Sequence, residues 1–353
     1  MSNKNNQLRA DMKKQRKQKK RRRITLILLP IFIILIGIGA YAYHLVSTAE
    51  KAINDAYQTD GRENGSELRE EKVSPATDNV SILFIGIDES DKRKEKQQSN
   101  QLSDALILAT LNIKDHTVKL LSIPRDSYVY IPERDTHTKI NHAHSYGGPK
   151  ATIETVENFL NVPVDYYVRL NFNAFMDIVD TLGGVEIDVQ KEIVEQDSRD
   201  VAGAIHLYPG LQTLDGEEAL AYARTRKIDN DIERGKRQQE LVKGIVSKAL
   251  SLGSVLKYDD LIETVGDNME TSMSFRDIRS LVAYGTTGSI NLESYTLEGT
   301  DSYINNIYYY QVDEESRASI EHTLRAHLDL INENQTDNAI NSSEPSSYAS
   351  PEY

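Results

Sequence analysis

The stretch Val80-Ser-Ile-Leu-Phe-Ile-Gly-Ile87 is a nearly continuous apolar run, and it ends in Asp88. Such a run predicts a strand that is buried on both faces, because a half-exposed strand would alternate apolar and polar residues. Two further apolar runs follow at 105–111 and 118–123, close enough to form a hairpin, and Pro124 follows the second. These runs predict the middle of a buried sheet.

The rest of the domain alternates between helical and strand patterns. Helical spacing predicts helices at 152–160, 172–182, 232–252 and 313–331, and a further helix that begins at Asp215 as its N-cap. Short strands are expected at 185–189, 292–297 and 307–311. This alternation predicts an α/β fold with a central mixed β-sheet flanked by helices in α-β-α layers.

Composition excludes several chemistries. The 353 residues contain no cysteine, so disulfides, thiolate catalysis and cysteine-ligated metals are excluded. The net charge of −13 is unevenly distributed, because residues 1–23 contain eleven Lys or Arg and one Asp, which leaves −23 on the remainder. An acidic remainder argues against a nucleic-acid-binding protein, and we expect no nucleic-acid partner.

The basic segment has a membrane explanation. Residues 24–46 contain no Asp, Glu, Lys or Arg, and a helix of that length crosses a bilayer core of roughly 30 Å. The positive-inside rule then predicts a single-pass anchor with a cytoplasmic N-terminus and an extracellular C-terminal domain. Ala40-Tyr41-Ala42 resembles a signal-peptidase site, but the apolar run is long for a signal peptide.

The expected organisation therefore has a membrane-bound and an extracellular part. It consists of a basic cytoplasmic tail (1–23), a transmembrane anchor (24–46), an extracellular stalk (47–79), a catalytic domain (80–331) and a disordered C-terminal tail (332–353). The stalk and the tail are polar and offer little apolar surface to bury.

Carboxylates lie at the ends of the predicted strands, where α/β folds place their sites. Asp88 ends the first strand, Asp104 opens the second, and Arg125-Asp126 follows the third. Two carboxylates at neighbouring strand ends can share a hard divalent cation, and Mg²⁺ prefers one or two carboxylates with phosphate oxygens. The alternative is that each Asp merely caps a turn.

A second cluster lies between residues 224 and 237, which contain six cations. Arg224 and Arg226 point the same way if the chain is extended there. Arg234, Arg237 and Gln238 share a helix face at i, i+3 and i+4 spacing. Such arginines can clamp a pyrophosphate, because each guanidinium offers a bidentate fork and keeps its charge. The alternative is the solvated face of a surface helix.

His142 and His144 alternate in the segment 139–148 and could ligate zinc, but no third ligand is evident. Hydrogen-bonded structural histidines fit this pattern better. The sequence has no G-x-S-x-G, H-E-x-x-H or P-loop motif.

A set of ordered motifs resembles the LytR-CpsA-Psr family of cell-wall glycopolymer ligases of Gram-positive bacteria. The resemblance covers roughly residues 79–252 and includes the basic N-terminus and single anchor. The motifs are Ile85-Gly86-Ile87-Asp88, Ser103-Asp104, Leu121-Ser122-Ile123-Pro124-Arg125-Asp126, Lys139-Ile140-Asn141-His142-Ala143, Tyr146-Gly147-Gly148, Val162-Pro163-Val164-Asp165-Tyr166-Tyr167, Leu182-Gly183-Gly184-Val185 and Ala221-Tyr222-Ala223-Arg224-Thr225-Arg226.

The resemblance implies an Mg²⁺-dependent phosphotransferase, with Mn²⁺ as an alternative metal. It would move an anionic glycopolymer, such as a teichoic acid or capsule polymer, from an undecaprenyl-pyrophosphate carrier to a peptidoglycan hydroxyl. The implied metal ligands are Asp88 and Asp104, and the implied catalytic residues are Arg125 and Asp231. The implied pyrophosphate-binding residues are Arg125, Arg224, Arg226, Arg234 and Gln238. A long apolar pocket would hold the prenyl chain.

The sequence departs from the family pattern at Leu102, where the family usually has Arg in an R-S-D motif. A phosphate contact would then be absent or supplied by the loop 91–94. The general base stays open among Asp88, Asp104 and Asp231, and the oligomeric state is not predicted. Two other functions remain: a prenyl-pyrophosphate pyrophosphatase, and a non-catalytic anchored regulator of envelope assembly that binds polymer or lipid.

Overall fold

The structure is a computed structural model that describes residues 43–44, 46–62, 65–88, 101–251 and 268–331. The predicted basic tail, the predicted C-terminal tail, the loop 91–94 and nearly all of the predicted membrane span lie outside the described residues. Within the described ranges, no helix combines the length and apolarity that crossing a membrane requires. The chain divides into two units, 1–51 and 52–353, and the described residues of the first are helical.

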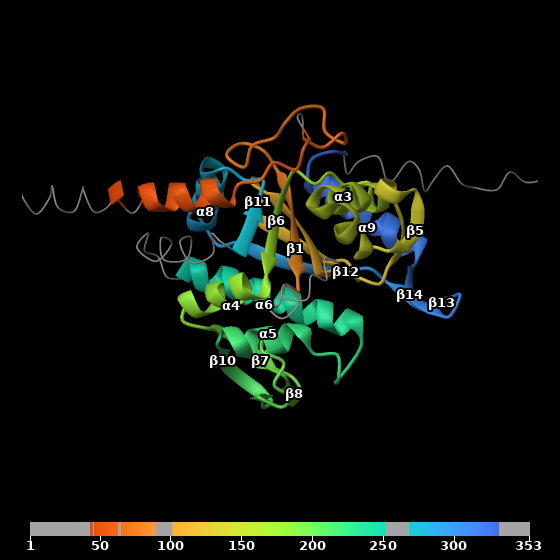
Figure 1. Cartoon of the computed structure of the whole chain (residues 1–353). Helices are drawn as coiled ribbons and strands as arrows, with labels where there is room; N and C mark the ends of the chain where they lie inside the picture. The colour runs from red at the N-terminus through yellow and green to blue at the C-terminus, as the bar shows by residue number, and fades with distance from the viewer. Residues whose placement is uncertain (1–42, 45, 63–64, 89–100, 252–267, 332–353) are drawn as a thin grey trace, which may run out of the picture. The chain divides into compact units, whose positions relative to one another are not determined.

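A mixed sheet forms the centre of the second unit (Figure 1). Among the described residues its order is β11-β6-β1-β2-β3-β12. The strands are β1 (Val80–Ile87), β2 (Ser103–Asn112), β3 (Thr117–Ser122), β6 (Tyr166–Asn171), β11 (Met269–Thr271) and β12 (Asn291–Thr296). β1 pairs in parallel with β6 and β3 with β12, whereas the remaining neighbours are antiparallel. The predicted mixed sheet and the predicted hairpin of β2 and β3 are confirmed.

Helices cover both faces of the sheet. They are α3 (His142–Leu160), α4 (Phe172–Thr181), α5 (Gly216–Arg224), α6 (Asp231–Ser251), α8 (Phe275–Thr286) and α9 (Glu314–His327), with a short 3-10 helix η1 (Pro132–Arg134). Leu83 and Ile85 of β1 belong to a core cluster with residues of α3 and α9, whereas Val80 and Ile82 pack in a second cluster with residues of α6 and α8. Because successive strand residues point to opposite faces, β1 lies between two helical layers.

Smaller hairpins surround the sheet. The pairs are β4 (Tyr128–Ile131) with β5 (Thr136–Lys139), β7 (Val185–Val189) with β10 (Gly210–Leu214), β8 (Ile193–Glu195) with β9 (Ile205–Leu207), and β13 (Gly299–Ile304) with β14 (Ile307–Val312). β7 to β10 share a third core cluster with α5 and α6. Asp215 caps α5 in a reciprocal capping box with Glu218, as its position before the helix predicts.

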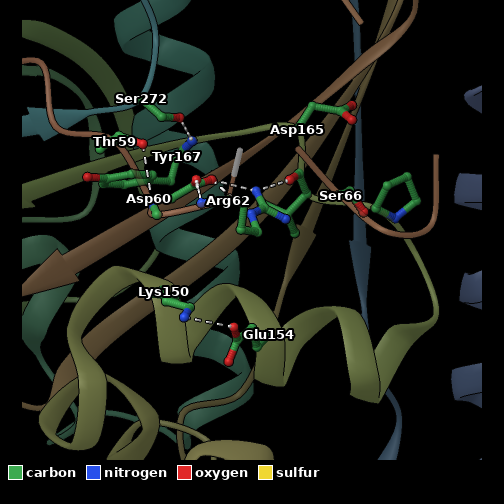
Figure 2. A network of polar contacts seen from close by, with 12 residues as sticks. Thr59, Asp60, Arg62, Ser66, Lys150, Glu154, Asp165, Tyr167 and Ser272 are labelled. Atoms are coloured by element: carbon green, nitrogen blue, oxygen red, sulfur yellow. Dashed lines mark hydrogen bonds and ion pairs between the residues drawn. The ribbon is translucent and has the colours of Figure 1, made fainter. Parts of the chain in front are cut away.

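Buried ion pairs fasten Arg62 and Arg69 of the expected stalk to the domain, and Figure 2 shows the surroundings of Arg62. Arg62 lies 2.7 Å from Asp60 and 3.0 Å from Glu157 of α3, and its Nη2 donates to the Val164 carbonyl. Arg69 makes a two-point contact with Asp165. Removing one partner from such a buried pair would leave an uncompensated charge, so this segment forms part of the folded domain.

Candidate functional site

Three polar segments meet at one end of the sheet, because β1 and β3 run in the same direction and β2 returns between them. Asp88 follows β1, Asp104 is the second residue of β2, and Arg125 follows β3. The register of β1 with β2 skips Asp104, which is therefore the extra residue of a β-bulge. Bulges re-aim side chains next to functional sites, and this one places a carboxylate within reach of Arg125.

Arg125 lies among carboxylates from separate parts of the chain. Its Nη1 forms an ion pair with Asp104 Oδ1, and its Nε lies 3.7 Å from Asp126 Oδ2 and 3.8 Å from Asp231 Oδ1. The Arg125 side chain is 16 % exposed. Its buried Nε has no hydrogen-bond partner among the described residues. Buried polar groups normally have a partner, so this donor points to a bound group or water at the site.

The first turn of α6 adds Asp231 and Arg234 to the group of charged residues around Arg125, which we call the arginine cluster. Arg234 Nη2 lies 2.6 Å from Asp231 Oδ1, and Arg234 is 5 % exposed. Its Nε is also a buried donor without a hydrogen-bond partner among the described residues. The two donors without a partner, Arg125 Nε and Arg234 Nε, belong to guanidinium groups. Guanidinium groups recognise phosphate through paired hydrogen bonds.

Burial perturbs both members of the Asp231–Arg234 pair. Burial raises the pKa of Asp231 above its ordinary value, although the nearby Arg234 and Arg125 guanidinium groups act to lower it. Burial lowers the pKa of Arg234, and the charges of Arg125 and Arg226 act in the same direction. Arginine stays protonated in proteins, so Arg234 carries its charge in a buried place beside two other cations, and an anionic ligand would relieve their repulsion.

Gly235 brings α6 close to the end of β3. A Cβ atom at residue 235 would lie 3.2 Å from Ser122 Cβ and closer still to its hydroxyl. Gln239, one turn further along, donates from Nε2 to the carbonyls of Leu120 and Tyr295 at 2.9 and 2.8 Å. The helix is thus fixed against β3 and β12, and this contact holds Arg234 at the sheet end.

The structure places Arg224 and Arg226 differently. Arg224 is the last residue of α5, and its guanidinium lies 4.8 Å from the centroid of the Phe172 ring, as in a cation–π contact. Arg226 is exposed, and its charge acts on Asp231 and Arg234. The site therefore contains Arg226 beside the buried pair, with Arg224 held over an aromatic ring at its edge.

Arg237 and Gln238, which share a helix face with Arg234 in the sequence pattern, contact the end of α5 instead. Arg237 donates to the carbonyls of Tyr222 and Thr225 and to Asp229. Gln238 Nε2 donates to the Ala223 carbonyl at 3.3 Å. These contacts close the loop between α5 and α6, so both residues hold the arginine-bearing segment in place.

Lys139 and Tyr308 also approach the cluster, and the sequence analysis did not single out either of them as a site residue. Lys139 Nζ lies 2.7 Å from Asp126 Oδ1 and 5.6 Å from the centroid of the Tyr308 ring. Burial raises the pKa of Tyr308, and a hydrogen bond from its hydroxyl to Asp301 acts in the same direction. Lys139 opens the Lys139–Ala143 motif, which was the available signal. Tyr308 lies in the predicted strand 307–311, but its approach to Lys139 depends on tertiary structure.

The two histidines make separate local contacts. His142 Nδ1 lies 2.9 Å from Thr138 Oγ1, and His144 Nδ1 lies 2.8 Å from the Gln101 carbonyl oxygen. Burial lowers the pKa of His142. Within the part of the chain that the structure describes, no three His, Cys, Asp or Glu side chains gather to hold a metal ion.

A divalent cation at this site would have to be held by fewer than three side chains of the described residues. The chemistry of Asp88 and Asp104 suits Mg²⁺, which binds through one or two carboxylates together with substrate phosphates and water. Asp104 is 30 % exposed at its side chain and Asp88 is half-buried, so neither is sealed in the core. The pair fits a cation that arrives with a phosphorylated substrate.

Comparison with known proteins gives consistent matches. The family model described as the LytR_cpsA_psr family matches residues 41–326. The chain is 39 % identical over 292 residues, covering 82 % of this chain and 89 % of the other, to the polyisoprenyl-teichoic acid–peptidoglycan teichoic acid transferase TagT of Bacillus subtilis. It is 41 % identical over 292 residues to an uncharacterised Staphylococcus aureus protein, covering 82 % of this chain and 72 % of that protein.

Solved structures of TagT are similar in fold to this chain. A structure of TagT with bound octaprenyl pyrophosphate lipid has a TM-score of 0.62 at 35 % identity, covering 76 % of this chain and 98 % of that one. A structure of TagT bound to LIIa-WTA has a TM-score of 0.67 at 38 % identity, with the same coverage.

Proposed function

The chain belongs to the LytR_cpsA_psr family, and from that premise we propose that it is a glycopolymer–peptidoglycan transferase. It moves an anionic glycopolymer from an undecaprenyl-pyrophosphate carrier to a peptidoglycan hydroxyl. Named relatives of similar length are teichoic acid transferases, which supports a teichoic acid as the polymer. One of them, TagT, was solved with a bound octaprenyl pyrophosphate lipid, which supports the carrier.

One observation carries the proposal at residue level: two guanidinium groups, Arg125 and Arg234, lie around Asp231 with buried donors that lack a hydrogen-bond partner among the described residues. A diphosphate supplies the acceptor oxygens that these donors need. Arg226 is exposed beside them, and its guanidinium would donate a further pair of hydrogen bonds to the diphosphate from the solvent side. Arg224 borders the same site over Phe172, and Gln238 supports the loop between them.

The reaction exchanges one phosphorus–oxygen bond for another. The acceptor hydroxyl oxygen bonds to the phosphorus that bears the glycopolymer, and the bond from that phosphorus to the bridging oxygen breaks. The polyprenyl phosphate leaves with the electron pair. Fixed cations stabilise charge that spreads over the phosphoryl oxygens, because they need no reorganisation during the step. Arg125 and Arg234 are already held in position for this by their carboxylate partners.

Asp231 is the general base in this proposal. Burial raises its pKa, and a carboxylate with a raised pKa accepts a proton more readily than an ordinary one. The acceptor hydroxyl proton passes to this group, and Arg234 holds the carboxylate in place. Mg²⁺ held by Asp88 and Asp104, or Mn²⁺ in its place, would neutralise charge on the diphosphate oxygens.

Leu102 bears on how completely the diphosphate is held. It is 36 % exposed two residues before Asp104, so the place of the family's usual arginine faces solvent here. We expect the clamp of this chain to rest on Arg125, Arg226 and Arg234 and to bind the diphosphate less tightly than a clamp with a further arginine.

Membrane anchoring through residues 24–46, with the domain outside the cell, belongs to the same proposal. It would keep the site at the bilayer surface, where a prenyl-linked substrate resides. Protease added to intact wall-less cells should then remove the domain, and a protected domain would contradict this topology.

Reconstitution tests the proposed reaction. The full chain in lipid vesicles is mixed with Mg²⁺, a polyprenyl-pyrophosphate-linked teichoic polymer labelled in its glycan, and peptidoglycan. The proposal predicts label bound covalently to peptidoglycan and release of polyprenyl phosphate. Released soluble polymer would identify a pyrophosphatase, and lipid binding without turnover would identify a non-catalytic regulator. Asp231→Asn should lose transfer, whereas Lys236→Ala, on an exposed side chain paired with Glu233, should retain it.

A further inference from the structure

A groove lies near the residues around Arg125, because the β4–β5 hairpin that lines it carries Lys139, which contacts Asp126. It has a volume of about 660 Å³ and lies between the β4–β5 hairpin, the C-terminal end of α3, β14 and the start of α9. These elements lie together on one side of the domain, at the right in Figure 1. The proposed phosphotransfer assigns no role to this groove.

Three aromatic rings form a shelf in the groove. Tyr128 and Tyr130 are two residues apart on β4 and so share a face, and His137 pairs with Tyr130 across the hairpin. The His137 ring centroid lies 5.6 Å from that of Tyr128 and 5.3 Å from that of Tyr130. Their ring faces carry partial negative charge and attract C–H bonds. We call these three residues the aromatic shelf.

Several other residues that line the groove are polar, and their charges sum to a small negative value. Asn158 and Gln311 offer exposed amide groups that both donate and accept hydrogen bonds. Arg317 is neutralised by Glu314 at 2.5 Å and Glu321 at 3.0 Å. With two carboxylates against one cation, the lining would repel a polyphosphate chain. It suits an uncharged ligand with flat C–H faces, hydroxyls and amides, which describes an N-acetylated sugar chain.

The shelf continues into the arginine cluster. Tyr128 pairs with Lys139, two residues along the ladder from the Tyr130–His137 pair. Lys139 Nζ in turn contacts Asp126, which neighbours Arg125. Two residues of extended strand span about 6.6 Å, so the Tyr130–His137 pair of the aromatic shelf lies about that far from Lys139. A sugar chain bound on the shelf would therefore extend toward Arg125.

We infer that this groove is the acceptor-glycan subsite, and that it binds an uncharged, N-acetylated sugar chain with its reactive hydroxyl directed toward Arg125. The inference rests on the proposed function, because that function supplies a glycan acceptor. It adds where the acceptor binds and which of the two polymers occupies the groove: the acidic lining excludes the polyanionic donor and admits the acceptor.

Calorimetric titration of the full chain in detergent with the tetrasaccharide of N-acetylglucosamine tests the inference. The variant Tyr130→Ala/His137→Ala removes two rings of the shelf, and outside it the Tyr130 hydroxyl contacts only the exposed Asp135 among the described hydrogen bonds. We expect the Kd for the tetrasaccharide to rise about tenfold. Gln311→Ala, on an exposed residue of β14, should raise the Kd by a smaller factor and serves if the double variant does not fold.

Tyr208→Ala is the matched control, because Tyr208 is 60 % exposed outside the groove and its ring also contacts a histidine ring, that of His206. It should leave the Kd unchanged. Equal affinity of the wild type and both groove variants, or absence of tetrasaccharide binding, would overturn the inference.

Two further readouts separate the inference from the proposed function. The KM for glycan acceptor should rise in the shelf variant, whereas the Kd for polyprenyl diphosphate should not. Tetrasaccharide binding that depends on the shelf, in a chain that transfers nothing, would refute the proposed function alone. Intact transfer with an unchanged acceptor KM in the shelf variant would refute the inference alone.

Discussion

Arg234 Nη2 lies 2.6 Å from Asp231 Oδ1 within the first turn of α6, and the two side chains are 6 % and 16 % exposed. Holding two charges out of water is costly unless each is well compensated. Here Arg125 and Arg226 add further positive charge to the same place. This burial of charge is weak evidence for stability, and it agrees with the proposed role of the pair in a phosphate site.

Loss of the carboxylate of Asp104 should abolish transfer. Asp104→Ala removes a proposed Mg²⁺ ligand and the partner of Arg125, while its position in a bulge at the sheet end leaves the strand pairing intact. Transfer should also stop with EDTA and return with Mg²⁺. Circular dichroism serves as the control: a variant that loses both its fold and its activity would favour a turn-capping role, and full activity in EDTA would remove the metal from the mechanism.

A methyl group at residue 235 should push α6 away from β3 and so displace Arg234. Gly235→Ala drives a Cβ atom into Ser122, and such overpacking costs about 1–3 kcal/mol. We expect a lower melting temperature and weaker binding of polyprenyl diphosphate, because α6 carries Arg234 away from Arg125. Ser122→Gly in the same chain should restore both properties. Equal affinity in Gly235→Ala and wild type would show that α6 does not position the arginine.

An arginine at position 102 should strengthen diphosphate binding. Leu102 is 36 % exposed and lies two residues before Asp104, so Leu102→Arg adds a guanidinium without burying it. A charge-assisted contact that remains partly solvated should lower the Kd by roughly two- to tenfold. Leu211→Arg, on another exposed leucine far along the chain, is the control for net charge. If both variants bind alike, position 102 is outside the phosphate site.

The stability of the fold should fall with acid through His327. This side chain is 7 % exposed between Thr110 and Thr117, and burial lowers its pKa to about 4. The unfolded chain takes up the proton near pH 6.5, so the stabilising effect is complete above that pH and is lost as the pH falls toward 4. The loss amounts to at most about 3 kcal/mol.

Urea unfolding at pH 7 and pH 4.5 measures this effect. His327→Gln should be less stable than wild type at pH 7, and the difference between the two should shrink at pH 4.5, since the variant has no proton to take up. A difference that is constant with pH would show that His327 does not titrate on unfolding.

Three neighbouring strands of the sheet, β1, β2 and β3, were predictable because they are largely buried on both faces, whereas β6 and β11 were not predicted. The run 80–87 has no polar residue other than Ser81, and residues 105–111 and 118–123 are similar. These apolar runs alone predict the strands, and Asp215 as an N-cap predicts the start of α5. The strand predicted at 307–311 is confirmed as β14. β4, β5 and β13 were not predicted, because their sequences are rich in tyrosine and polar residues, whose pattern does not separate a strand from a loop.

The candidate site was only partly predictable for a geometric reason. Helical spacing places Arg234, Arg237 and Gln238 on one face, but α6 packs between the sheet and α5, and that face has contacts on both sides. Arg234 turns toward Asp231, whereas Arg237 turns to the carbonyls of Tyr222 and Thr225. Spacing cannot decide between these directions. The contact of Lys139 with Asp126 joins β5 to the end of β3 and depends on tertiary structure.

The most direct test of the account is the affinity of the full chain for polyprenyl diphosphate when Arg226 is replaced by Lys. The substitution keeps the charge and removes the bidentate fork, so the account predicts weaker binding by about 1–3 kcal/mol. Lys236→Ala, at an exposed residue of α6 that pairs with Glu233, should change the affinity by less than about 0.5 kcal/mol. If Arg226→Lys binds the diphosphate as tightly as Lys236→Ala does, the arginine cluster is not the diphosphate clamp.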